Sequence, residues 1–338
     1  MATAIPPKAP PTILSRLFRR SRNGAGEELV GPIRGEVLGL ERLGERARAV
    51  ARGHHLLPAQ KQRGAGPLLL RLEDTRAVLD RVYHQLNNGA ERGLDISPAG
   101  DWLLDNYHVV QEHIGEVRES LPGSYYRELP ELGAGPLAGY PRVYELATTL
   151  ISHTEARVDL ENLGLVVEAF QSVTPLRIGE LWALPAMLSL ALLESLRRMA
   201  LRTVERLDQV AEAHGWAARI QAASEGHASA LGAALADFMA HPPALTADFV
   251  AILLQQLRPA RGALPPLVWL EHWIAEEALS AEEAAARSGA RLAVTQVITS
   301  NSVTSLRTIG RLDCRRSWSG TAGSSASCGR TLPASTRA

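Results

Sequence analysis

The sequence predicts an all-α protein, arranged as a multi-helix bundle or as an array of helix pairs. Apolar residues recur at three- and four-residue spacing through most of the chain, and no segment shows a convincing alternation of β-branched and polar residues. With 338 residues and 46% apolar content, the chain can bury a substantial core. We find no repeat with a fixed period of about 30 to 50 residues, which leaves an irregular array of helix pairs open.

The two ends differ in composition from the rest and bracket a predicted helical module over residues 31–313. Residues 1–30 are rich in proline and arginine and predict a disordered basic arm, whose apolar face is too short to favour membrane contact over a solvated tail. Residues 314–338 are dominated by Ser, Gly, Thr and Arg and predict a disordered tail in which Cys314 and Cys328 have no function. We interpret this tail as the product of a shifted reading frame, because one choice of codons restores helical apolar spacing in the alternative frame.

The first half of the module contains three predicted helices. Apolar spacing predicts one helix over Ile33–Gly53 and another that starts at Leu68 and ends near Gly89, after two asparagines. A third is predicted from Ser97 to Leu121, because Ser97 is a good N-cap, a proline follows it, and the apolar spacing continues to a Leu-Pro-Gly stop.

The second half is predicted to be helical almost throughout. Pro141 is expected to open a helix that runs through Ile151, and Asp159 the next one. The most apolar segment, Leu181–Leu193, spans only about 20 Å as a helix, short of a hydrocarbon core of roughly 30 Å. We therefore predict a buried helix that Pro185 starts or kinks, and no membrane span. Further helices are predicted at Leu196–His214, Ala222–Ala240, Asp248–Leu257, Leu267–Leu279 and Ala281–Arg307.

Charge and cysteine content exclude several classes of protein. Lys plus Arg and Asp plus Glu both number 36, so the bulk charge offers no field to attract nucleic acid. Two cysteines supply neither a disulfide framework nor a four-cysteine zinc site, which fits a reducing compartment. No secretory signal is recognisable at the start of the sequence.

The residues alone give no catalytic, cofactor-binding or metal-binding signature. His108, Glu112 and His113 share adjoining turns but have no third ligand at a useful spacing, so we interpret them as surface polar residues. Acidic residues near Asp159 are better explained as helix capping than as an acid–base pair. The chain contains no Asp-x-Asp metal motif of the kind that holds a sugar diphosphate, and no nucleophile elbow.

The most distinctive stretch is a Tyr-rich corner at residues 121–144, where tyrosines, glycines and prolines concentrate in a chain with only 5% aromatic residues. Its polar groups can form a structural latch that satisfies helix-end carbonyls, or an interaction hot spot. We favour the latch and keep the interface open. The candidate residues for either role are Trp102, Tyr125, Tyr126, Arg127, Glu128, Tyr140, Arg142 and Trp182.

These motifs resemble the N-terminal region of the bacterial cyclic β-1,2-glucan synthases. The resemblance is carried by Ser97–Asn106, Tyr125–Pro130, Gly135–Tyr144, Thr174–Leu176 and Ile178–Ala183. It implies a synthase that builds and cyclises β-1,2-linked glucan from UDP-glucose, with a metal-dependent transferase domain among membrane helices and a phosphorylase-like domain after it.

The likeness extends from about Gly35 to Asp313, and the sequence stops before either catalytic domain. No catalytic residue of the family falls within the matched region, so none is assigned, and UDP-glucose and a divalent metal are implied only for the full synthase. The resemblance implies a cytoplasmic helical module at the inner face of the inner membrane, which packs on the transferase domain and is inactive alone. A free-standing helical scaffold that binds a partner through the Tyr-rich corner is the alternative.

Overall fold

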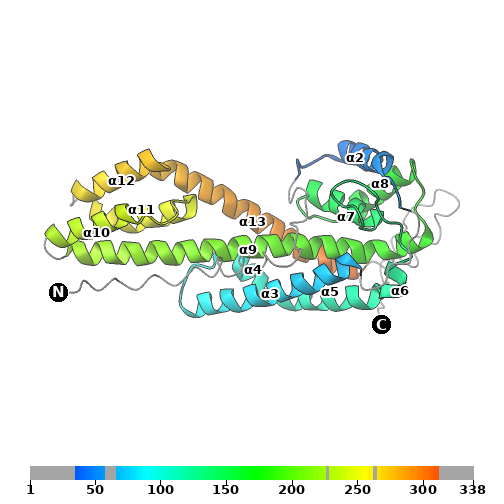
Figure 1. The fold of residues 1–338 in the computed structure, drawn as a ribbon, viewed down its shortest axis with the longest axis horizontal. Coiled ribbons are helices and arrows are strands. Elements are labelled where there is room, and N and C mark those ends of the chain that lie inside the picture. Colours follow the sequence, from blue (N-terminus) through cyan, green and yellow to red (C-terminus); the bar gives the residue numbers. More distant parts are fainter. Residues whose placement is uncertain (1–34, 58–65, 226–227, 262–264, 312–338) are drawn as a thin grey trace, which may run out of the picture. The chain divides into compact units, whose positions relative to one another are not determined.

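The computed structural model describes residues 35–57, 66–225, 228–261 and 265–311. The all-α prediction is confirmed, because these ranges contain helices and two isolated β-bridges but no strand (Figure 1). The predicted arm and tail, residues 1–30 and 314–338, lie outside the described residues. The helices are α2 (Leu40–Gly53), α3 (Pro67–Glu91), α4 (Ser97–Asp105), α5 (Tyr107–Ser120), α6 (Gly123–Tyr126), α7 (Arg142–His153), α8 (Leu160–Gln171), α9 (Ile178–Ser224), α10 (Ala228–Ala240), α11 (Ala247–Arg261), α12 (Pro265–Glu277) and α13 (Ala281–Gly310).

The chain divides into two compact units that are interleaved in sequence. Within the described residues, unit 1 comprises Arg76–Tyr107 and Leu196–Ser300, and unit 2 comprises residues 35–75, His108–Ser195 and residues 301–311. Helices α3, α9 and α13 each contribute residues to both units. Each unit therefore assembles from segments that are far apart in the sequence.

Unit 1 has a core built around aromatic rings. Phe238 in α10 makes an edge contact with Trp216 of α9 at 5.0 Å between centroids and stacks on Phe249 of α11 at 6.4 Å. Leucines and alanines from α9 to α13 complete the same apolar cluster. The same unit contains a buried hydrogen bond, in which the Ser288 hydroxyl donates to the Asp248 carboxylate. This core holds α10, α11 and α12 against the C-terminal half of α9.

In unit 2, α2 packs against α7 and α8. The capping prediction at Asp159 is confirmed. The Asn162 backbone amide donates to the Asp159 carboxylate over 2.9 Å, and the Asp159 backbone amide donates to the side-chain oxygen of Asn162. Just before this cap, Glu155 and Ala156 both have positive φ, at 51° and 64°. The Ser305 hydroxyl of α13 donates to the Ala156 carbonyl over 2.7 Å, which ties this unusual turn to the end of α13.

Helix α3 ends two residues beyond Gly89, near which its end was predicted. The helix continues to Glu91, and Gly93, with φ of 72°, takes the left-handed position that ends it. The Leu94 amide donates to the Gly89 carbonyl and the Gly93 amide donates to the Ala90 carbonyl, which is the Schellman pattern. Gly89 stays helical, and the Ile96 and Leu207 side chains lie against it.

The helix predicted from Ser97 to Leu121 is divided into α4 and α5. Asn106 ends α4, and its side-chain amide donates to the Trp102 carbonyl over 2.7 Å, so a local side-chain bond competes with helix continuation. Ser97 does not cap α4 with its hydroxyl. It has a φ of 67°, and its backbone amide donates to the Asp95 carboxylate instead.

Helix α9 joins segments that were predicted as separate helices. Both Pro185 and Gly215 lie inside it. At Gly215, the burial of neighbouring residues such as Ala213 and Ala217 outweighs a glycine cost of about 1 kcal/mol. The length argument from thirteen residues is also corrected. Among the described helices, α9 contains an 18-residue window with the length and composition of a membrane span. However, 78% of that window is buried in the protein, as in a core helix.

The remaining helix predictions differ from the structure mainly in their ends. The first helix begins at Leu40, whereas apolar spacing placed its start at Ile33. Helix α6, a single turn at Gly123–Tyr126, was not predicted. Helices at the predicted places are found for α7, α8, α11, α12 and α13.

Candidate functional site

A closed loop between Pro130 and Arg142 shapes the Tyr-rich corner. The Arg142 amide donates to the Pro130 carbonyl over 2.9 Å, so the chain returns on itself before α7 begins. Gly135 and Gly139 have φ of 88° and 82°, which glycine adopts without the steric cost of a side chain. The loop therefore places Arg142 at the first position of α7.

Arg142 forms a buried ion pair with Glu180 in the first turn of α9. The two side chains are 3% and 1% exposed. Arg142 Nε donates to Glu180 Oε1 over 2.7 Å, and Nη2 donates to Oε2 over 2.8 Å. Nη2 also donates to the Pro175 carbonyl over 2.9 Å, and the guanidinium lies 5.7 Å from the centroid of the Phe170 ring. Both charges are thus compensated by an opposite charge and by hydrogen bonds, as burial requires.

Glu180 has a second role as a helix cap. It occupies the third position of α9, and its Oε2 accepts the backbone amide of Arg177 over 2.9 Å. This is the reciprocal half of a capping box, and its negative charge also complements the helix dipole. One carboxylate therefore fixes both the start of α9 and the start of α7.

Tyr125 adds a bond to the same turn of α9. Its hydroxyl donates to the Gly179 carbonyl. Burial raises the pKa of Tyr125, and the neighbouring carboxylates of Glu128 and Glu180 raise it further, so the phenol keeps its donor proton. We call Tyr125, Arg142, Pro175, Gly179 and Glu180 the latch cluster.

Tyr126 lies beside this cluster as a core residue. It is fully buried, and its ring lies against Gly66, where an added Cβ would meet a ring carbon at 2.0 Å. Burial raises the pKa of the Tyr126 phenol well above its ordinary value. Its role is packing against the chain that leads into α3.

The other candidate residues are not brought into the latch cluster. Arg127 and Glu128 are exposed, and Tyr140 is half-buried and stacks on Tyr144 with 5.9 Å between ring centroids. Trp182 is 56% exposed on α9. Trp102 belongs to α4 of unit 1, and it is partly buried there.

Sequence reasoning selected Tyr125 and Arg142 but missed their partners. Glu180 carried a detectable signal, since a glutamate three residues after the N-terminal boundary of a helix is the capping-box position. No sequence signal indicated that it pairs with Arg142, which lies 38 residues away. The roles of the Pro175 and Gly179 carbonyls could not be predicted either, because every residue has a backbone carbonyl that can accept a hydrogen bond.

The interactions of the latch cluster are structural. Its carboxylate is occupied by a guanidinium and a backbone amide, and its phenol is occupied by a carbonyl. Elsewhere in the described residues, no three His, Cys, Asp or Glu side chains gather as metal ligands. The cluster therefore orders the N-terminal turn of α9 and the face that this turn presents.

Comparison with known proteins confirms the predicted resemblance. No protein-family model matches the sequence. The chain is 35% identical, over 246 residues, to cyclic beta-(1,2)-glucan synthase NdvB of Rhizobium meliloti (strain 1021). The match covers 71% of this chain and 8% of the synthase, so the chain is similar to a small part of a much longer protein.

Proposed function

We propose that this chain, as a relative of part of a cyclic β-1,2-glucan synthase, is a non-catalytic helical module that packs on the transferase domain of such a synthase. The observation that carries this proposal is the 35% identity over 71% of the chain. In the proposal, UDP-glucose and a divalent metal bind elsewhere in the synthase, and the module lies at the cytoplasmic face of the membrane. The chain alone does not transfer glucose.

The N-terminal turns of α9 supply the contact surface in this proposal. Ile178 and Trp182 are four residues apart and therefore lie on one side of the helix, and they are 61% and 56% exposed. Large aromatic residues of this kind dominate the binding energy of protein interfaces. The latch cluster fixes the same helical turn through Gly179 and Glu180, so the pair is held in place before a partner arrives.

A glucosyl-transfer assay tests the catalytic half of the proposal. The purified chain is incubated with labelled UDP-glucose and a divalent metal, with a full-length synthase as the positive control. We expect no labelled glucan from the chain. Incorporation of glucose above background by the chain alone would show that it carries a transferase site of its own.

A binding assay tests the docking half. The chain is titrated against the separately produced remainder of a synthase, and Trp182→Ala is compared with Trp269→Ala, which removes a similarly exposed indole from α12. We expect Trp182→Ala to weaken binding about tenfold or more, because a truncated hot-spot residue costs about 2 kcal/mol, and Trp269→Ala to have no effect. Equal affinities for both variants and the wild type would remove this face from the proposal.

A further inference from the structure

The outward side of α12 in unit 1 exposes large apolar side chains. The helix buries Leu267, Leu270 and Ile274 in the core of the unit. On its other side, Val268 and Trp269 are 52% and 49% exposed. Contact with water is unfavourable for such side chains, and burial against another segment removes it. This side of α12 is therefore suited to docking.

The same helix ends in an acidic segment. Residues 265–286 contain five glutamates and neither lysine nor arginine. Glu276 and Glu277 are exposed in the last turn of α12, and the first turn of α13 adds two further exposed glutamates. Glu276 follows Trp269 by seven residues, or about two helical turns, so the two lie on the same side of the helix. We call Val268, Trp269, Glu276 and Glu277 the α12 face, which is apolar at its start and negative at its end.

A complementary pattern occurs in residues 13–22, which lie outside the described residues. Residues 1–26 contain five Lys or Arg and no Asp or Glu. Within residues 13–22, large apolar residues come mainly first and arginines mainly last: Ile13, Leu14, Arg16, Leu17, Phe18, Arg19, Arg20 and Arg22. Amphipathic segments of this kind dock on apolar helix faces and fold as they bind. The apolar half of this basic segment matches the start of the α12 face, and its arginines match the glutamates.

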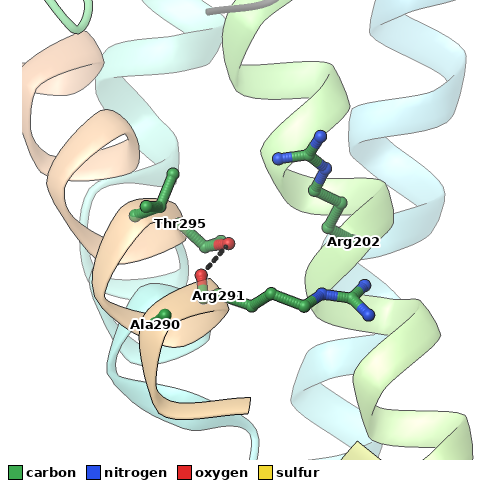
Figure 2. Close-up of a pocket in the computed structure, with 5 residues that line it drawn as sticks. Arg202, Ala290, Arg291 and Thr295 are labelled. Atoms are coloured by element: carbon green, nitrogen blue, oxygen red, sulfur yellow. Dashed lines mark hydrogen bonds between the residues drawn. The ribbon is translucent and has the colours of Figure 1, made fainter. Parts of the chain in front are cut away.

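Two other parts of the chain fit the basic segment less well. Residues 93–117 also contain five Asp or Glu and no Lys or Arg, but none of their large hydrophobic side chains is exposed. The pocket between α9 and α13 is lined by Arg202 and Arg291 (Figure 2), whose positive charge repels a basic segment. The α12 face combines exposed apolar groups with negative charge. We propose that residues 13–22 of this chain dock on the α12 face.

Limited proteolysis of the whole chain with trypsin at low ionic strength tests the proposal. Trypsin cuts after the arginines of residues 13–22, and mass spectrometry times these cuts against those in a synthetic peptide of residues 10–24. When docking is fast, cleavage follows the population of the undocked form, so about 90% docking slows it about tenfold. We expect at least this protection relative to the peptide. We also expect its loss in about 1 M sodium chloride, where the Debye length is about 3 Å.

Two variants alter opposite halves of the α12 face. Trp269→Ala removes the exposed indole, and Glu276→Lys/Glu277→Lys reverses the charge at a helix end whose dipole favours lysine. We expect each to weaken docking about tenfold or more and so to bring cleavage close to the rate of the peptide. The control, Asp101→Lys/Asp105→Lys, makes the same charge change at exposed positions of α4, and its protection should equal that of the wild type.

A charge exchange keeps the test decisive if a single variant is destabilised. Arg19→Glu/Arg20→Glu combined with Glu276→Lys/Glu277→Lys should restore protection of the bonds after Arg16 and Arg22, measured against a peptide with the same arginine substitutions. Failure to restore it overturns the proposal.

Other outcomes decide between occupants of the α12 face. Wild-type cleavage at the rate of the peptide, or equal loss of protection in Asp101→Lys/Asp105→Lys, also overturns the proposal. So does protection that appears only with phosphatidylserine vesicles and is unchanged in Trp269→Ala, because it assigns the basic segment to a membrane. Protection independent of protein concentration supports docking within one chain, and protection that grows with concentration supports docking of this segment on a second copy.

Discussion

Removing one member of the buried Arg142–Glu180 pair is expected to destabilise the protein strongly. In Glu180→Gln, the Arg142 guanidinium stays buried with no opposite charge beside it, one of its two carboxylate acceptors becomes an NH2 donor, and α9 loses the charge at its N-terminus. In Arg142→Met, the Glu180 carboxylate keeps only the Arg177 amide among its bonds described above. Breaking a buried pair costs about 3–5 kcal/mol, because the surviving charge is desolvated without its partner.

A double-mutant cycle separates the pair from the packing around it. Arg142→Met/Glu180→Gln removes both charges and keeps similar volumes, so we expect it to cost less than either single substitution. The matched control is the exposed pair Arg118–Glu73, whose side chains are about half exposed. Breaking that pair is expected to cost at most about 1 kcal/mol.

Urea unfolding followed by circular dichroism, with near-ultraviolet spectra as a check on tertiary packing, measures these differences. The reasoning is refuted if Glu180→Gln and Arg142→Met each cost less than about 1 kcal/mol, the level of a surface pair. It is also refuted if the double substitution costs the sum of the single ones, because the two side chains are then not coupled.

Three further substitutions and one pH titration test other features. Tyr126→Ala is expected to cost about 3–5 kcal/mol in urea unfolding, as for other buried aromatic rings, and a loss below about 1 kcal/mol contradicts the burial described. Gly66→Ala should lower the melting temperature, because the Tyr126 ring occupies the space that its Cβ needs; unchanged melting would show that the ring moves aside at no cost. Ser305→Ala should cost about 1–3 kcal/mol, since the Val158 amide loses its acceptor, whereas Ser300→Ala, at a partly exposed position of the same helix, serves as a near-neutral control. His113 is buried, so its interpretation as a surface residue is wrong. Burial lowers its pKa in the folded protein, so the unfolded chain binds more protons and stability should fall as the pH drops below about 6.5. His113→Gln should flatten this part of the stability–pH curve, and an unchanged curve would assign the effect to other groups.

The fold was predictable because apolar spacing marks helices wherever they bury a face. Local exceptions were not predictable at the same level. The break at Asn106 depends on a side-chain bond that an asparagine inside a helix need not make, and the end of α3 depends on which of two nearby glycines adopts positive φ. The candidate site shows the same limit. Tyr125 and Arg142 stood out by composition, whereas the partnership with Glu180 follows from the tertiary fold.

Arg127 illustrates why residue type alone misleads at a corner. It is the arginine next to the paired tyrosines, yet it is exposed, and the buried guanidinium belongs to Arg142. The difference follows from position, because Arg142 begins a helix that packs in the core and Arg127 ends a single helical turn. The sequence pattern alone does not distinguish these two environments, because it does not show where α6 ends.

The bond from Ser305 to the turn at Ala156 has a consequence for how the chain is made. The two residues are 149 positions apart, and at about 5–20 residues per second a ribosome needs on the order of 7 to 30 s to synthesise the intervening segment. During that interval the strained turn is already outside the ribosome without the hydroxyl that holds it. Unit 2 can therefore reach its final structure only after the segments of unit 1 that precede Ser305 have been translated.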